Sequence, residues 1–293
     1  MVTQALIPAA GLGTRLLPLS WAIPKELLPI GTKPALQWIA EELADAGANR
    51  FCLVTSPRKA DIDALFRSDD ALKKALTQSN KPDLLRTLWS HGPYAAVEIL
   101  TCVQEQQRGL GHAVLCGEQG LRPEPFILAL GDSLMHPYGH NSLTNRLVQT
   151  FNEHHADAVI AFQKVPREHV SRYGIAATRE STPVFVVEDL IEKPSPETAP
   201  SNLAIAARYV FRESIFDYLR QLTPGKDGEL QLTDAIRAMI RGGGKVLGVR
   251  LAPDERRVDV GNFRDYATAF IEQALSEDPE LKTRMRKLLA GDA

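Results

Sequence analysis

The stretch from Ala5 to Arg15 reads Ala-Leu-Ile-Pro-Ala-Ala-Gly-Leu-Gly-Thr-Arg, a short apolar run that leads directly into a turn with two glycines. The apolar run predicts a buried β-strand, because consecutive apolar residues ended by turn residues are typical of strands covered on both faces. Gly11 and Gly13 let the backbone N–H groups of the turn approach phosphate oxygens. The stretch therefore predicts an α/β protein whose first strand leads into a phosphate-binding loop.

The same turn differs from two common nucleotide-binding patterns. The dinucleotide fingerprint Gly-x-Gly-x-x-Gly needs a third glycine, whereas this turn continues with Arg15. Pro18 and Pro24 also prevent the long helix that would follow such a fingerprint. The sequence contains no Gly-x-x-x-x-Gly-Lys-Ser/Thr segment. A nicotinamide dehydrogenase and a P-loop nucleotide hydrolase are therefore disfavoured.

The composition is that of a globular protein with balanced charge. The 293 residues include 34 Lys+Arg and 36 Asp+Glu, which gives a formal net charge of −2. This balance argues against a basic surface, and we expect no nucleic-acid partner. The sequence has neither a secretory signal pattern nor an uncharged apolar stretch of about 18 residues, so we expect a cytoplasmic protein without a membrane span. Cys52, Cys102 and Cys116 lack metal-ligand spacing, and we expect them to be reduced core residues.

Strand patterns alternate with helical patterns along the whole chain. Residues 34–47 have apolar side chains at helical spacing, begin with a proline and end at Gly47, so they predict a helix that covers one sheet face. A second helix is predicted after Asn262 as N-cap, closing the fold. We expect the helical region 59–91 to be an insertion between two strands. The predicted strands are 5–7, 51–54, 97–103, 125–130, 158–162, 173–178, 184–191, 203–211 and 245–251.

The N-terminal turn is followed by Ala22-Ile23-Pro24-Lys25-Glu26-Leu27-Leu28-Pro29, and the two segments together resemble the signature of the sugar-1-phosphate nucleotidylyltransferase family. Within that family the resemblance is to bacterial enzymes that transfer uridylyl groups to glucose 1-phosphate. It continues through further ordered motifs, which are far more specific together than singly. These are Gln104 with Gly109-Leu110-Gly111-His112-Ala113, Leu130-Gly131-Asp132, Tyr173-Gly174, Glu192-Lys193-Pro194, Ser201-Asn202-Leu203, Gly228-Glu229-Leu230 and Val258-Asp259-Val260-Gly261-Asn262.

The resemblance implies a Rossmann-like, three-layer nucleotide-diphospho-sugar transferase fold with a mixed central sheet. It implies a single domain over 1–293, with a nucleotide-binding half at about 1–135, a sugar-phosphate half at about 136–262 and a C-terminal helical segment at 263–293. The implied reaction forms UDP-glucose and pyrophosphate from UTP and glucose 1-phosphate with Mg²⁺. We also expect a homo-oligomer.

The resemblance also implies a role for each motif residue. Arg15, Lys25 and Lys193 are the expected catalytic cations, because the reaction joins two polyanions and needs charge neutralisation rather than a general base. Asp132 and Asp259 are the expected metal ligands. The expected nucleotide-binding residues are Ala10, Gly11, Gly13, Thr14, Glu26, Gln104 and Gly109, and the expected sugar-phosphate-binding residues are Gly174, Glu192, Lys193 and Asn202.

Three positions depart from the family pattern. Trp21 stands where relatives usually carry a lysine, Ala207 stands where a glycine is usual, and Gly131-Asp132 is more typical of thymidylyltransferases. Two alternatives therefore stay open: an enzyme specific for dTTP or another sugar, and a catalytically weak regulatory paralogue that binds sugar nucleotides. His112 is expected to be a packed or hydrogen-bonding residue without a chemical step.

Overall fold

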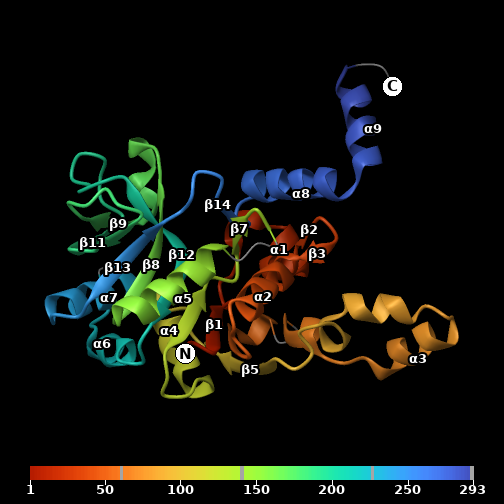
Figure 1. Ribbon diagram of the computed structural model, residues 1–293, viewed down its shortest axis with the longest axis horizontal. Coiled ribbons are helices and arrows are strands. Elements are labelled where there is room, and N and C mark those ends of the chain that lie inside the picture. The colour runs from red at the N-terminus through yellow and green to blue at the C-terminus, as the bar shows by residue number, and fades with distance from the viewer. Residues whose placement is uncertain (60–61, 139–141, 226–227, 291–293) are drawn as a thin grey trace.

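Ten strands form one mixed sheet among residues 1–59, 62–138, 142–225 and 228–290, which the computed structural model describes (Figure 1). Residues 60 and 61 of the predicted insertion, and the last three residues of the C-terminal segment, lie outside these ranges. The strands of the sheet are β1 (Gln4–Pro8), β4 (Arg50–Thr55), β5 (Glu98–Val103), β6 (Phe126–Ala129), β8 (Ala158–Lys164), β9 (Gly174–Ala177), β10 (Val184–Val186), β11 (Asp189–Glu192), β12 (Leu203–Phe211) and β13 (Val246–Arg250).

The order of the strands across the sheet is β10-β13-β8-β12-β6-β1-β4-β5, with β9 and β11 attached beside β12. Strand β1 pairs in parallel with both β4 and β6, and β4 pairs in parallel with β5. Strand β12 is antiparallel to β6 and β8. The carboxyl ends of β1, β4, β5 and β6 therefore meet at one edge of the sheet, where α/β proteins bind their ligands.

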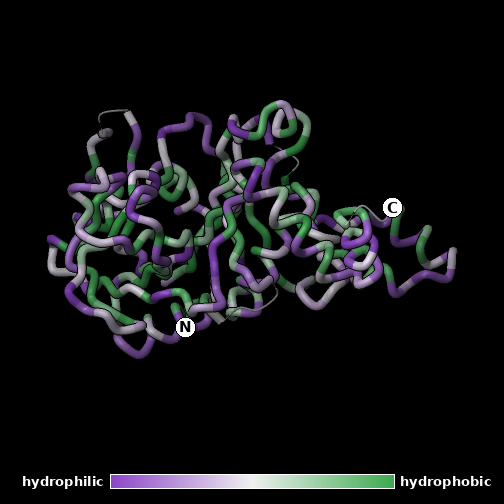
Figure 2. Tube along the Cα trace, turned by 90° about the horizontal axis from the view of Figure 1, so that it is seen from above, coloured by the Kyte–Doolittle hydropathy of each residue, from purple (hydrophilic) through white to green (hydrophobic). Residues whose placement is uncertain are grey.

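Helices cover both faces of the sheet, so the fold has three layers. One face is covered by α2 (Ala35–Asp45) and α5 (Ser142–His154), whose apolar side chains join one core cluster. The opposite face is covered by α4 (Leu110–Gly117), α6 (Ile215–Gln221) and α7 (Leu232–Arg241), which join a second cluster. Hydrophobic segments run through the interior of the molecule (Figure 2). The predicted α/β class, mixed central sheet and three layers are confirmed.

Two small strand pairs lie outside the main sheet. Strand β7 (Ser133–His136) pairs antiparallel with β14 (Arg256–Asp259), and this pairing brings the segment after β6 beside the segment before the C-terminal helices. Strand β2 (Pro29–Ile30) pairs with β3 (Lys33–Pro34). Neither pair was predicted, because runs of two to four residues carry no readable periodicity.

Short helical turns make up much of the chain between β4 and β5. These are η3 (Pro57–Lys59), η4 (Ile62–Phe66), α3 (Asp70–Gln78), η5 (Pro82–Thr87) and η6 (Trp89–His91). Since β4 and β5 are parallel neighbours, a single crossover helix would join them, and these turns are the insertion that the sequence predicts. The remaining short elements are η1 (Thr14–Leu16), α1 (Leu19–Ala22), η2 (Lys25–Leu27), η7 (Glu118–Gly120) and η8 (Arg167–Arg172).

The C-terminal segment forms α8 (Phe263–Glu277) and α9 (Pro279–Ala290), which project from the body of the molecule (Figure 1). Asn262 is the N-cap of α8 as predicted, and its side-chain oxygen accepts from the N–H of Asp265 at 3.0 Å. The apolar side of α8 is only partly covered: Tyr266 packs on the core, whereas Phe263 is exposed. Within the described ranges, no helix combines the length and apolar character needed to span a membrane.

The predicted elements agree with the structure except at one strand and at the C-terminal helix. The single helix predicted after Asn262 is wrong, because α8 ends at Glu277 and α9 begins at Pro279, whose ring cannot continue a helix. The helix predicted at 34–47 is α2, and the strand predicted at 203–211 is β12. The single strand predicted at 184–191 is wrong, because β10 pairs with β13 whereas β11 pairs with β9. Between β10 and β11 the chain changes its pairing partner from β13 to β9, so the strand is interrupted there. The division of the chain into a nucleotide half and a sugar-phosphate half stays a prediction.

Candidate active site

A pocket of about 340 Å³ opens at the carboxyl ends of β1, β5 and β6. It contains most of the residues that the sequence assigns to nucleotide binding. Its charged lining residues are Lys25, Glu26, Asp132 and Glu229. The other lining residues are Pro8, Ala10, Gly11, Gln104, Gln107, Gly109, Leu110, Ala113 and Leu130.

Two glycines of this region adopt backbone angles that favour glycine. Gly13 has a φ of 68° in the turn after β1, and Gly109 has a φ of 90° immediately before α4. A Cβ atom at Gly109 would also lie 2.8 Å from the carbonyl oxygen of Leu230. The loop that enters α4 can therefore pack against the segment before α7 only because residue 109 has no side chain.

Lys25 connects the glycine turn to the end of β6. Its ammonium group donates a hydrogen bond to Oδ2 of Asp132. Burial alone would lower the pKa of Lys25, but the nearby carboxylates of Asp132 and Glu26 hold it above its usual value. Burial likewise opposes ionisation of Asp132, whereas Lys25 and Arg257 lower the pKa of that carboxyl. Both groups are therefore charged at neutral pH.

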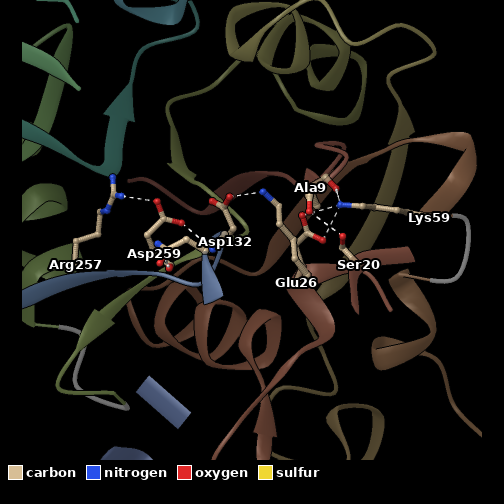
Figure 3. A network of polar contacts seen from close by, with 11 residues as sticks. Ala9, Ser20, Glu26, Lys59, Asp132, Arg257 and Asp259 are labelled. Carbon is tan, nitrogen blue, oxygen red and sulfur yellow. Dashed lines mark hydrogen bonds and ion pairs between the residues drawn. The ribbon is translucent and has the colours of Figure 1, made fainter. Parts of the chain in front are cut away.

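Glu26 has a partner that the sequence did not reveal. Nζ of Lys59 donates to Oε1 and Oε2 of Glu26 at 2.9 and 2.8 Å and to the carbonyl oxygen of Ala9 at 2.7 Å. Glu26 is 1% exposed and Lys59 is 8% exposed. Burial raises the pKa of Glu26 and lowers the pKa of Lys59, each opposed by the charge of the other. Lys59 thus ties the insertion to the turn that follows β1 (Figure 3).

Gln104 follows β5, and its side chain lies inside the larger pocket. A glutamine at an isolated strand position would be expected to face solvent, but Gln104 does not. It is 4% exposed. Its Nε2 donates to the carbonyl oxygen of Gly109 at 3.3 Å and lies 2.9 Å from Nδ1 of His112. Burial and nearby Arg108 lower the pKa of His112, which keeps its ring neutral. The prediction that His112 is a hydrogen-bonding residue is confirmed.

A second pocket of about 130 Å³ adjoins the first, and Leu110 and Leu130 line both. Gly174 and Glu192 line it, and Oε2 of Glu192 accepts from the hydroxyl of Thr233 at 2.6 Å. A Cβ atom at Gly174 would lie 3.3 Å from that carboxylate oxygen. Nζ of Lys193 lies 3.7 Å from Oε1 of Glu192, and its side chain is 55% exposed.

Two residues beside the second pocket have left-handed backbone angles without being glycine. Lys193 has a φ of 46° and Ala207 has a φ of 58°, the latter within a bulge of β12. Such angles cost about 1 to 3 kcal/mol and persist where the surroundings enforce them. The carbonyl oxygen of Ala207 accepts from the N–H of Leu130 at 3.3 Å and from Nη1 of Arg208 at 3.1 Å. Arg208 is itself held by a buried ion pair with Glu42.

Asp132 lines the larger pocket, and Asp259, which lines neither pocket, lies close to it. The N–H of Val260 donates to the carbonyl oxygen of Asp132 at 2.9 Å, and Oδ1 of Asp259 accepts from the N–H of Gly261 at 2.8 Å. A Cβ atom at Gly261 would lie 2.8 Å from Oδ1 of Asp259 and 3.3 Å from Oδ2 of Asp132. Both carboxylates therefore border the same small space. Figure 3 shows them side by side, with Arg257 beyond Asp259 and Glu26 and Lys59 on the other side.

Six of the predicted site residues lie outside the lining of both pockets, namely Gly13, Thr14, Arg15, Lys193, Asn202 and Asp259. Gly13, Thr14 and Arg15 belong to the turn and η1, where Thr14 and Arg15 are exposed. Nδ2 of Asn202 donates to the carbonyl oxygen of Val165 at 3.2 Å, which is a loop-stabilising contact. Their roles in binding stay predictions.

Comparisons with known proteins agree with this geometry. Residues 4–275 match the family described as nucleotidyl transferase. The chain is 38% identical over 285 residues to the UTP–glucose-1-phosphate uridylyltransferase YngB of Bacillus subtilis (strain 168), covering 97% of this chain and 93% of that protein. The UTP-bound UGPase from Acinetobacter baumannii is 33% identical, with a TM-score of 0.87 and 99% of both chains covered.

A further solved structure contains a sugar nucleotide. The UDP-glucose pyrophosphorylase complexed with UDP-glucose is 32% identical to this chain, with a TM-score of 0.78, and the match covers 94% of this chain and 98% of that one. Since the family match spans residues 4–275 and the relatives are matched over nearly their whole length, the chain belongs to the nucleotidyl transferase family.

Proposed function

We propose that this protein is a UTP–glucose-1-phosphate uridylyltransferase, which forms UDP-glucose and pyrophosphate. The observation that carries the proposal is the pair of adjoining pockets together with two neighbouring carboxylates, Asp132 in the larger pocket and Asp259 close to it. The larger pocket suits a nucleotide, and the smaller one suits a sugar phosphate. The relatives described as bound to UTP and to UDP-glucose support this assignment of substrates.

The chemistry needs positioned cations more than a general base. An oxygen of the sugar phosphate attacks the α-phosphorus of UTP, a new P–O bond forms, and the bond to the β-phosphate oxygen breaks to release pyrophosphate. The attacking phosphate is already an anion at pH 7, because its second pKa is about 6. We assign Arg15, Lys25 and Lys193 to the neutralisation of phosphate charge. Lys25 is the one of these that lines the nucleotide pocket.

The nucleotide pocket supports a preference for uracil. We assign Ala10, Gly11, Gly13 and Thr14 to the phosphates and ribose, and Gln104 with Gly109 to the base. Because Nε2 of Gln104 faces the acceptor oxygen of Gly109, its side-chain carbonyl is the atom left to accept from a base. Uracil has an N3–H that can donate to it, whereas the N3 of cytosine carries no hydrogen.

Gly174 and Glu192 line the smaller pocket, and we assign them, together with Lys193 and Asn202, to sugar-phosphate binding. A carboxylate accepts hydrogen bonds from sugar hydroxyls, and Glu192 is oriented for this by Thr233. The close approach of Gly174 to that carboxylate leaves no room for a side chain there. Glu26 is assigned to the nucleotide side, where Lys59 holds it.

Asp132 and Asp259 fit a magnesium ion. Oδ1 of Asp259 and Oδ2 of Asp132 lie 2.8 and 3.3 Å from the same point beside Gly261, and Mg²⁺ is usually bound by one or two carboxylates together with substrate phosphates. When bound, the ion would supply a positive charge at the phosphates. Without it, the ammonium of Lys25 and the guanidinium of Arg257 are the partners of these carboxylates.

We also propose a cytoplasmic homo-oligomer. The exposed apolar residues of α8, namely Phe263, Phe270 and Ile271, offer a surface that a second copy would cover. Light scattering coupled to gel filtration measures this directly. A monomer at micromolar concentration would contradict the proposal.

Pyrophosphate release across a panel of substrates tests the activity. With glucose 1-phosphate and Mg²⁺, we expect UTP to be used best, dTTP less well, and CTP, ATP and GTP poorly. Galactose 1-phosphate and mannose 1-phosphate serve as alternative sugar substrates at a fixed UTP concentration. A preference for dTTP or for another sugar phosphate would replace the proposal with a related specificity, and the absence of release with every pair would favour a regulatory sugar-nucleotide binder.

A further inference from the structure

Arg257 points into the site although no motif assigned it a role. It lies on β14 two residues before Asp259, and alternate residues of a strand share a face, so both side chains point the same way. Strand β14 pairs with β7, which begins immediately after Asp132. The pairing of β7 with β14 thus places the carboxylates of Asp132 and Asp259 and the guanidinium of Arg257 in the same region.

The contacts of Arg257 fix its guanidinium at the wall of the smaller pocket, which it lines together with Gly174 and Glu192. Its Nη2 donates to Oδ2 of Asp259 at 3.0 Å, and the centre of the guanidinium lies 5.2 Å from the centre of the Tyr173 ring. The side chain is 11% exposed. A guanidinium stacked on a ring keeps its N–H groups in its own plane, free to donate sideways.

A sugar phosphate needs a positively charged partner in the smaller pocket, because the other charged groups in or beside it are a carboxylate and exposed cations. Glu192 places a carboxylate beside the space that a sugar phosphate would enter, and this carboxylate repels the phosphate. Lys193 is largely exposed and lies 3.7 Å from Glu192. Arg172 also lines the pocket, but it is exposed. Arg257 is therefore the less exposed of the two cations among the described lining residues.

We propose that Arg257 binds the phosphate of the sugar 1-phosphate and sets the specificity of the smaller pocket for a phosphorylated sugar. This inference rests on the proposed function and adds a residue to its sugar-phosphate side. One of the five N–H donors of Arg257 contacts Asp259. The remaining N–H groups can donate in pairs to the oxygens of a phosphate. Arg257 also keeps that phosphate beside Asp259, its hydrogen-bond partner.

The test compares ligands that do and do not contain the second phosphate. UDP-glucose carries the phosphate that comes from the sugar, whereas UMP contains the nucleotide half alone. Calorimetric titration of both ligands in EDTA gives their affinities without metal. We expect Arg257→Gln to weaken UDP-glucose binding by about tenfold or more while UMP binding changes less than about twofold. Arg257→Lys is expected to recover part of the loss, because it restores the charge without the fork.

Arg256→Gln is the matched control. Arg256 is the neighbouring residue on β14, lies on its other face, is half-exposed and pairs with Glu272 of α8. We expect both ligands to bind this variant as they bind the unaltered protein. Thermal unfolding of all variants shows whether each is folded. In steady-state assays, Arg257→Gln is expected to raise the KM for glucose 1-phosphate more than the KM for UTP.

Two results would overturn the assignment of Arg257. One is an unchanged UDP-glucose affinity in Arg257→Gln. The other is an equal loss for UMP and UDP-glucose, which would mean that Arg257 only supports Asp259 or the fold. Failure of the proposed function is a separate result: the unaltered protein would then release no pyrophosphate from UTP and glucose 1-phosphate, whatever the affinities of the Arg257 variants.

Discussion

Replacement of Lys59 by methionine tests whether one ammonium group keeps the buried charge of Glu26 in place. Lys59 donates to both carboxylate oxygens of Glu26 and to the carbonyl oxygen of Ala9, and both charged side chains are almost fully buried. Methionine has a similar length and fills the space without a charge. The variant therefore leaves a carboxylate and a carbonyl without their donor, at the base of the nucleotide pocket.

Removal of one partner of a buried ion pair costs about 3 to 5 kcal/mol. Lys25 also lowers the pKa of Glu26, so a second cation remains, and we expect a value near the lower limit. The lost hydrogen bond to Ala9 adds about 1 kcal/mol. The expected loss is thus about 4 kcal/mol at neutral pH. It should be smaller at pH 5 than at pH 8, because the unpaired carboxyl has a raised pKa and is stabilised by protonation at low pH.

Urea unfolding followed by tryptophan fluorescence measures these values for Lys59→Met, Glu26→Gln and the double variant. The double variant removes both charges, and we expect it to recover about half or more of the stability that Lys59→Met loses. Lys33→Met is the control, because Lys33 forms a partly exposed pair with Glu41 and should cost about 1 kcal/mol or less. A loss below about 1 kcal/mol in Lys59→Met, or no recovery in the double variant, would refute the reasoning.

Three other changes have defined outcomes. Asp132→Asn and Asp259→Asn should lower kcat about tenfold or more in proteins that still fold, and activity should be lost in EDTA and return with Mg²⁺; full activity after EDTA dialysis would contradict the metal assignment. Gln104→Glu should raise the KM for UTP, because it adds a negative charge near the phosphates, and an unchanged KM would remove Gln104 from the base site. Arg237 lowers the pKa of Asp189, so their pair stabilises the fold above the usual pKa of Asp, and this contribution is lost as the pH falls through the lowered pKa. Asp189→Asn should cost up to about 1 kcal/mol at pH 7 and less at pH 3 in urea titrations, and an equal cost at both pH values would be inconsistent with this.

The central sheet was predictable because its strands are long enough to show a pattern. The apolar run 203–211 is β12 from end to end, and the buried face of α2 matches its helical spacing. Strands β7 and β14 are too short to be seen in this way, although they join Asp132 to Asp259. The usual glycine at position 207 was a signal for the left-handed angle of Ala207, but the contacts that hold it were out of reach, because they come from Leu130 and from Arg208, which is held by Glu42 far away in the sequence.

The site motifs predicted which side chains gather, but not which charges they meet. Lys25 and Glu26 are neighbours in the sequence, yet Lys25 pairs with Asp132, 107 residues away, and Glu26 pairs with Lys59, 33 residues away. A local sequence pattern around Lys25 and Glu26 cannot contain Asp132 or Lys59, because these partners follow two other strands, β6 and β4. Lys59 and Arg257 were missed for this reason. Lys59 lies in η3 and Arg257 lies in β14, which are both short elements, and neither residue belongs to a motif. Their burial beside opposite charges, which only the fold creates, is the property that marks them as parts of the site.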